Sequence, residues 1–150
     1  MTLRRLLSHT GGIGTPSFDG YRENEDLPSL LQILDGLPPA NSDPHDLALL
    51  LIELQLSLRG ASNRVLKRET VEMMMTRVVD GGMGLGVRLW DLNSQAYFGH
   101  DGENAGFISL LEGHRDAGVG MVAMTNGDNG TALVKRIVEA VAADQHWPGQ

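Results

Sequence analysis

Residues 83–125 read MGLGVRLWDLNSQAYFGHDGENAGFISLLEGHRDAGVGMVAMT, and this stretch decides the fold. Short apolar segments alternate in it with turns rich in Gly, Asn and Asp, which is typical of successive β-strands. The predicted strands are Met83–Trp90, Gln95–Gly99, Gly106–Gly113 and Gly118–Thr125. Because the links between them are short, each strand is expected to pair with the next one, and the sequence predicts an antiparallel β-meander.

Helical patterns flank this stretch on both sides. Asp43 is suited to cap a helix and Pro44 to occupy its first turn, while Gly60 marks its end. The predicted helices cover residues 2–7, 43–59, 67–77 and 131–143, and residues 27–34 are expected to form a helical turn or two. The last helix carries apolar residues at helical spacing and is expected to pack on the sheet. The expected class is therefore α+β, with N-terminal helices, a meander and a covering C-terminal helix.

Composition restricts the function. The chain has 150 residues, 41% of them hydrophobic and 21% charged, as is usual for one globular domain. A net charge of −7 argues against a nucleic-acid partner, and the absence of cysteine excludes disulfides and thiolate metal sites. The longest apolar run, Leu47–Ile52, is too short to cross a bilayer, and no signal peptide follows Arg4–Arg5. We expect no membrane partner and a cytoplasmic location for the chain as written; a start further upstream would leave the location open.

Five blocks along the chain resemble segments of a known family. They are TLRRLLSHTGGI at 2–13, DLALLLIELQLSL at 46–58, GMGLG at 82–86, FGHDGENAGF at 98–107 and MTNGDNG at 124–130. In this order they resemble segments of class C β-lactamases, D-alanyl-D-alanine carboxypeptidases, other penicillin-binding proteins and family VIII esterases. The resemblance implies a partial β-lactamase/transpeptidase-like fold and descent from a bacterial serine hydrolase that acts on β-lactams, D-Ala peptides or esters.

The motifs that such enzymes use for catalysis are absent from this chain. They need an S-x-x-K, in which one helical turn places the lysine beside the nucleophilic serine. Here Lys67 is preceded at that offset by Arg64, and Lys135 by Ala132. A Y-x-N element is also missing. The resemblance therefore implies a remnant that is inactive by itself.

The two missing motifs predict how the chain is organised. In relatives, S-x-x-K lies upstream of the L-L-x-H-T block and the tyrosine element lies between that block and the D-L-A helix. We therefore interpret residues 41–44 as a deletion junction. It separates an N-terminal segment, 1–42, from a helix-sheet-helix segment, 43–150, within a single partial domain.

The resemblance leaves one wall of an active site, His100-Asp101-Gly102-Glu103, in the place of the family's K-T-G or H-x-G. Gly102 would let the backbone approach a substrate, and the Glu103 amide would donate to an oxyanion. The alternative is that His100 is merely a turn histidine between glycines. No cofactor is predicted, and no metal, because His45, His114 and His146 lack ligand spacing.

Three functional hypotheses stay open. The chain is an inert remnant, a binding module that holds a small molecule or peptide near His100, or half of a split hydrolase whose partner chain carries the nucleophile. Loss of N-terminal strands would leave an exposed sheet edge. We therefore expect self-association or a complementing chain at that edge.

Overall fold

The computed structural model describes residues 44–104, 106–127 and 129–150. Its elements are α3 (Pro44–Leu58), α4 (Arg68–Met74), β1 (Arg88–Leu92), β2 (Gln95–Asn104), β3 (Phe107–His114), β4 (Gly120–Thr125) and α5 (Gly130–Asp144). The elements expected before residue 44, the block at 2–13 and the junction at 41–43 lie outside the described residues. The helices and the sheet together confirm the expected α+β class.

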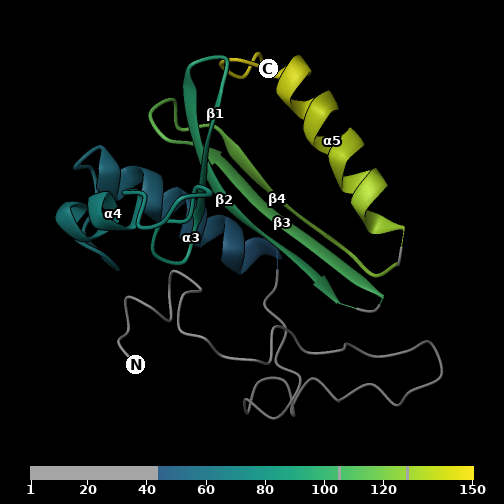
Figure 1. Ribbon diagram of the computed structural model, residues 1–150, viewed down its shortest axis with the longest axis horizontal. Helices are drawn as coiled ribbons and strands as arrows, with labels where there is room; N and C mark the ends of the chain where they lie inside the picture. The colour runs from purple at the N-terminus through teal and green to yellow at the C-terminus, as the bar shows by residue number, and fades with distance from the viewer. Residues whose placement is uncertain (1–43, 105, 128) are drawn as a thin grey trace, which may run out of the picture.

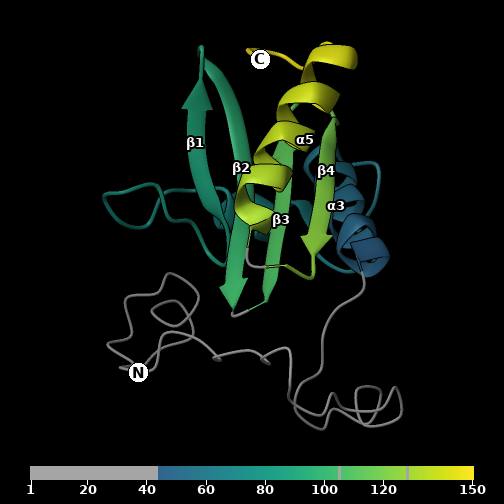
Figure 2. The ribbon, with the colours of Figure 1, turned by 90° about the vertical axis from the view of Figure 1, so that its right-hand side faces the viewer.

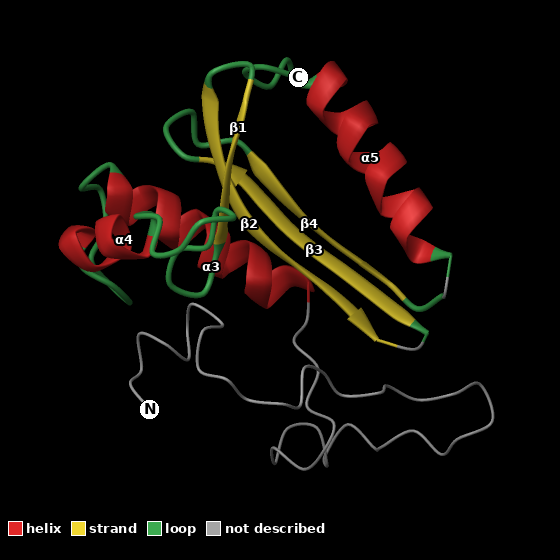
Figure 3. Cartoon of the chain, in the orientation of Figure 1, coloured by secondary structure: helices red, strands yellow, loops and turns green. Residues whose placement is uncertain are grey.

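The four strands form one antiparallel sheet in the order β1-β2-β3-β4, which confirms the meander (Figures 1 and 3). Its first hairpin closes through Asn93 and Ser94, whose φ angles are 47° and 64°. Positive φ at both turn residues is the requirement of a two-residue type I′ hairpin, and asparagine tolerates this conformation well. Leu92 and Gln95 consequently pair directly across the turn.

Helices cover both faces of the sheet and make a three-layer structure. Figure 2 shows α5 lying across one face, with α3 behind the sheet. Phe98 and Leu111 belong to the core on the α3 and α4 side, where Phe98 has no exposed surface. Tyr97 and Ile108 belong instead to the clusters that α5 covers. The strict alternation of strand side chains thus supplies two separate cores from the same strands.

A carboxylate holds the connection between α3 and α4 against α3. Both carboxylate oxygens of Glu53 accept hydrogen bonds from Ser62 Oγ at 2.8 Å, and the backbone N–H of Arg64 donates to one of them at 3.0 Å. These bonds, led by that of Ser62, lower the pKa of Glu53. Hydrogen bonds to the Glu53 side chain therefore hold this loop in place in addition to packing.

Two boundaries differ from the prediction. The first strand begins at Arg88 and not at Met83, because the preceding segment is bent by Gly82 and Gly86, at φ 85° and 78°. Helix α4 ends at Met74, short of Arg77, because the backbone N–H of Leu85 takes the Met74 carbonyl as its acceptor.

The second strand is longer than predicted and continues to Asn104. Its extension pairs with β3 as far as the Asn104–Phe107 pair. The reading of His100 as a turn histidine is therefore wrong, since the residue lies within a strand. None of the described helices is both long enough and apolar enough to cross a membrane.

Candidate functional site

The four residues expected to form one wall lie consecutively on β2 but on alternate faces of the sheet. Asp101 and Glu103 pair with Leu110 and Ile108, which pack toward α5. His100 pairs instead with Leu111, which belongs to the core under α3 and α4. Directly paired residues share a face, so the side chain of His100 lies on the opposite face of the sheet from those of Asp101 and Glu103.

The space between α5 and the sheet holds a cavity of about 370 Å³. Its apolar surface comes from strand residues below and from α5 above. Its lining includes the apolar residues Trp90, Ile108, Leu110, Val134 and Val138, together with the polar residues Asp101, Glu103, Glu112, Thr131, Lys135, Glu139 and Gln150. An apolar hollow with a few polar groups is the usual form of a small-molecule site.

A second cavity of about 460 Å³ lies at the end of β1 and reaches His100. It shares four lining residues with the first cavity, namely Trp90, Asp101, Leu110 and Glu112. The two cavities are therefore neighbours, and the predicted ligand position near His100 adjoins the space under α5.

Glu112 is the buried polar group of this region. It lies near the end of β3, paired with Gly99 on one side and Met121 on the other, and only 9% of its surface is exposed. No hydrogen bond or ion pair joins its carboxyl group to another residue of the described ranges. Burial raises the pKa of Glu112, because the charged form is poorly solvated.

Gly99 makes room beside this carboxyl group. A Cβ atom at that position would clash with the carbonyl oxygen of Leu111 and would also lie 3.1 Å from Cη2 of Trp90 and 3.2 Å from Cα of Glu112. The missing side chain lets the Trp90 ring lie over β2, where it stacks on Tyr97 with 5.9 Å between ring centroids and 16° between ring planes. Trp90 therefore forms an aromatic side wall next to Glu112.

Asp101 has a partner of its own. Its carboxylate forms an ion pair with Arg88 of the neighbouring strand, and both side chains are more than half exposed. Such a surface pair contributes little stability. Because Arg88 forms this ion pair with Asp101, it does not pair with Glu112.

Two further charged residues, Lys135 and Glu139, stand one turn apart on α5 and line the same cavity from the exposed side. A third polar feature is a histidine, His114, which is buried under Tyr97 with 4.9 Å between ring centroids. The histidine and its neighbours form hydrogen bonds within the fold and do not line either cavity.

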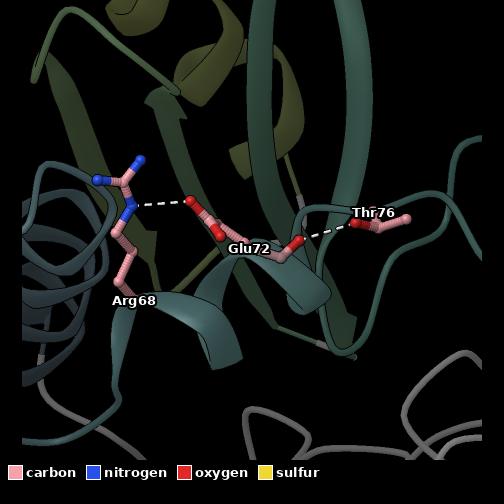
Figure 4. A network of polar contacts seen from close by, with 3 residues as sticks. All are labelled: Arg68, Glu72 and Thr76. Atoms are coloured by element: carbon pink, nitrogen blue, oxygen red, sulfur yellow. Dashed lines mark hydrogen bonds and ion pairs between the residues drawn. The ribbon is translucent and has the colours of Figure 1, made fainter.

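Figure 4 shows a polar network on α4 that is separate from these cavities. Arg68 Nε donates to Glu72 Oε1 at 2.8 Å, and the hydroxyl of Thr76 donates to the Glu72 carbonyl at 2.8 Å. None of the three lines either cavity. This network supports the helix end. Across the described ranges, no group of three or more His, Asp or Glu side chains is placed to hold a metal ion.

The fold therefore defines an α+β protein with a cavity between its C-terminal helix and its sheet. It is similar to a crystal structure of SurE, with a TM-score of 0.57 and 24% identity over 65% of this chain and 24% of that chain. It is also similar to a crystal structure of SurE with D-Leu, with a TM-score of 0.60 and 23% identity over 68% of this chain and 26% of that chain. The chain spans about a quarter of the length of these structures. No family model and no curated protein matches the chain.

These comparisons correct the family assignment made from the sequence. The matched structures carry the name SurE, and nothing in the comparisons supports a serine β-lactamase, penicillin-binding protein or esterase. The expected function, a remnant of a β-lactam, D-Ala peptide or ester hydrolase, is overturned with it. The four motif residues at 100–103 lie on β2, and the role expected of them stays a prediction.

The sequence did not indicate Glu112, Trp90 or Lys135 as site residues. One signal was present in FISLLEGH at 107–114, where Ile108, Leu110 and Glu112 fall on one strand face. A single acid at the end of an apolar strand face is a sign of a buried carboxyl group. The cavity beside this carboxyl group is formed by residues of α5 and β1, which are distant in the sequence, so the pattern of β3 alone could not predict it.

Proposed function

We propose that this chain binds a small organic molecule in the cavity between α5 and the sheet. The observation that carries the proposal is Glu112, a residue with 9% of its surface exposed, whose carboxyl group has no hydrogen bond or ion pair within the described ranges and lies where the two cavities meet. Such a group costs stability unless something satisfies it, so its presence in a cavity favours a ligand.

The surroundings favour a ligand with an apolar body. Leu110 and Val138 supply apolar surface from the sheet and from α5, and Trp90 supplies the aromatic wall. One matched structure is titled as SurE with D-Leu, a small apolar amino acid. D-leucine is for this reason the first ligand to test, with L-leucine beside it and a short peptide ending in leucine as the larger alternative.

The test is a titration of isotope-labelled protein followed by two-dimensional NMR. Binding in this cavity predicts chemical-shift changes at residues that line it. Thr131→Trp places a large side chain at the exposed mouth of the cavity and is expected to abolish the changes. Ala132→Trp is the matched control, since Ala132 is exposed on the same turn and does not line the cavity. Saturable shifts that persist in Thr131→Trp, or none with any of the three ligands, contradict the proposal.

A specific observation favours a second role, association with another polypeptide. Helix α3 buries Leu51 and Leu54 and yet leaves Leu49 and Ile52 about half exposed, at 52% and 50%. A helix that is apolar on several sides is typically enclosed by protein. We propose that its outer surface pairs with a second copy or a complementing chain, in addition to any pairing at the sheet edge.

A further inference from the structure

We infer that the cavity under α5 selects a ligand that carries a protonated amino group on an apolar body, and that Glu112 accepts hydrogen bonds from that group. The inference rests on the proposed small-molecule function and adds the chemical class of the ligand. It assigns a binding role to a residue that the sequence motifs did not indicate.

The placement of Glu112 is the first argument. Its side chain shares the α5 face with Ile108 and Leu110, and both cavities include it in their lining. The exposed fraction of 9% shows that bulk water does not solvate the carboxyl group fully. An ammonium group brought by a ligand would supply the charge-assisted hydrogen bonds that the fold itself does not supply.

The charges around Glu112 are the second argument. Titratable groups on the same sheet face, on neighbouring strands or on α5, are Arg88, Tyr97, Asp101, Glu103, His114, Lys135 and Glu139. Arg88 is held by Asp101, and Lys135 is exposed on α5. Among its described residues the first cavity is lined by four carboxylates, Asp101, Glu103, Glu112 and Glu139, of which Asp101 is paired with Arg88, and by one cation, Lys135. This balance favours a cation over an anion.

The size and polarity of the rest of the cavity are the third argument. Leu110, Val134 and Val138 would contact a branched aliphatic chain, and Trp90 would contact its side or the ammonium group. A ligand without the amine would leave Glu112 unsatisfied, and a ligand with a carboxylate alone would place like charges together. Selectivity is expected to arise from this mismatch.

Proton release gives an independent readout. Burial raises the pKa of Glu112, and a bound cation lowers it again because the cation stabilises the charged carboxylate. Binding of an amine is therefore expected to release a proton wherever Glu112 is protonated in the empty protein. Affinity for the amine should rise with pH across that range, while affinity for a neutral ligand should fall or stay constant.

The experiment compares three ligands that share one branched chain: 3-methylbutylamine, 3-methylbutanol and 4-methylpentanoate. Calorimetry on the full chain, in two buffers of different ionisation enthalpy, measures both affinity and proton release. The amine is expected to bind most tightly and the carboxylate most weakly. Glu112→Gln should weaken the amine by about tenfold or more, as for loss of a charged hydrogen bond. The control Glu69→Gln, an exposed residue of α4 that lines neither cavity, should leave the affinity for the amine unchanged.

The outcomes separate the inference from the proposed function. If none of the three ligands binds, the small-molecule function and the inference both fail. If the alcohol or the carboxylate binds as tightly as the amine, or Glu112→Gln binds the amine unchanged, the function stands and the inference is wrong. Should Glu112→Gln fail to fold, the ligand order and the proton release of the unmodified chain decide the matter alone.

Discussion

Gln55 and Val119 lie 64 positions apart in the chain, yet the Gln55 side-chain N–H group donates to the Val119 carbonyl at 2.8 Å. The same amide donates to the His114 carbonyl at 3.1 Å. Gln55 is buried, with 4% of its surface exposed. One side chain thus fastens α3 to the connection between β3 and β4.

Replacement of Gln55 by leucine should destabilise the protein by about 1–3 kcal/mol, because it leaves two buried carbonyl groups short of a donor. Gln55→Glu is the sharper variant. Its carboxylate has the same shape but cannot donate when ionised, so its stability should recover as the solution is acidified and the group becomes protonated. Chemical denaturation across pH measures both effects, and equal pH profiles for Gln55→Glu and the unmodified chain would show that the two hydrogen bonds contribute nothing.

His114 should make stability depend on pH near neutrality. Its Nδ1 atom accepts from the backbone N–H groups of Asp116 and Ala117, at 3.1 and 2.9 Å, so Nε2 carries the proton and faces Gln95 at 3.1 Å. Burial lowers the pKa of His114, and Asp116 opposes this effect in part. The unfolded chain therefore binds a proton as pH falls below about 6.5, and the folded protein binds it only at a lower pH. Stability is expected to fall as pH decreases through this range.

The matched variant for this prediction is His114→Asn, since an asparagine oxygen retains an acceptor close to the place of Nδ1. The variant should be less stable overall, because it loses the contact with Tyr97. Its stability should, however, no longer fall as the pH decreases through the titration range of histidine. Thermal unfolding as a function of pH is the measurement. If the unfolding temperature of His114→Asn still falls with decreasing pH, another group is responsible for the pH dependence.

Glu112 should make the stability depend on pH in the opposite sense to His114. Burial raises the pKa of Glu112, so the folded protein binds more protons than the unfolded chain as pH rises above about 4.5. Its contribution to stability is present at low pH and is lost as pH increases through the folded pKa. Glu112→Gln is therefore expected to be more stable at neutral pH, by about 1 kcal/mol, and equal to the unmodified chain in acid. Denaturation of both proteins at acidic and neutral pH is the measurement. A variant that is less stable than the unmodified chain at neutral pH would contradict the prediction.

The core under α3 should tolerate much less change than the surface of α4. Phe98 has no exposed surface, and its truncation to alanine should cost about 3–5 kcal/mol because it leaves a cavity. Glu72→Ala removes an ion pair whose side chains are 57% and 44% exposed, and it should change stability by less than about 0.5 kcal/mol. Urea denaturation compares the two, and a similar cost for both would contradict the assigned core.

Association through α3 should respond to one charge. Ile52→Lys places an ammonium group at the centre of the exposed apolar surface, which disfavours its burial against another polypeptide. Sedimentation should show concentration-dependent association of the unmodified chain and its loss in the variant. Arg136→Glu, which also changes an exposed helical residue but on α5, is the control for charge alone. A monomer at all concentrations would refute self-association and leave a complementing chain to be tested.

Local sequence patterns were enough to predict helices α3 and α5 and the order of the strands. The capping pair at Asp43 and Pro44 and the helical spacing after Gly130 predicted α3 and α5 closely. Turn residues between short apolar runs predicted the meander, because a short link permits only antiparallel neighbours. These features depend on residues that are close in sequence.

The family and the site depended on more distant relationships. The block at 82–86 resembled a family motif, but its outer glycines, Gly82 and Gly86, adopt positive φ to make turns. Any chain that bends in this way prefers glycine there, so the match reported local geometry and not descent. Similarly, the burial of Glu112 arises from Trp90 on one strand and from α5, at the end of the chain, which no local pattern contains.

The alternation along β2 has a consequence for how this protein can change. Neighbouring codons at positions 100 and 101 encode side chains that belong to opposite layers, one toward α3 and one toward α5. A substitution at Asp101 or Glu103 alters the lining of the cavity under α5, whereas one at His100 alters that of the neighbouring cavity. A single strand thus lets selection adjust two surfaces separately, while an insertion of one residue would exchange them.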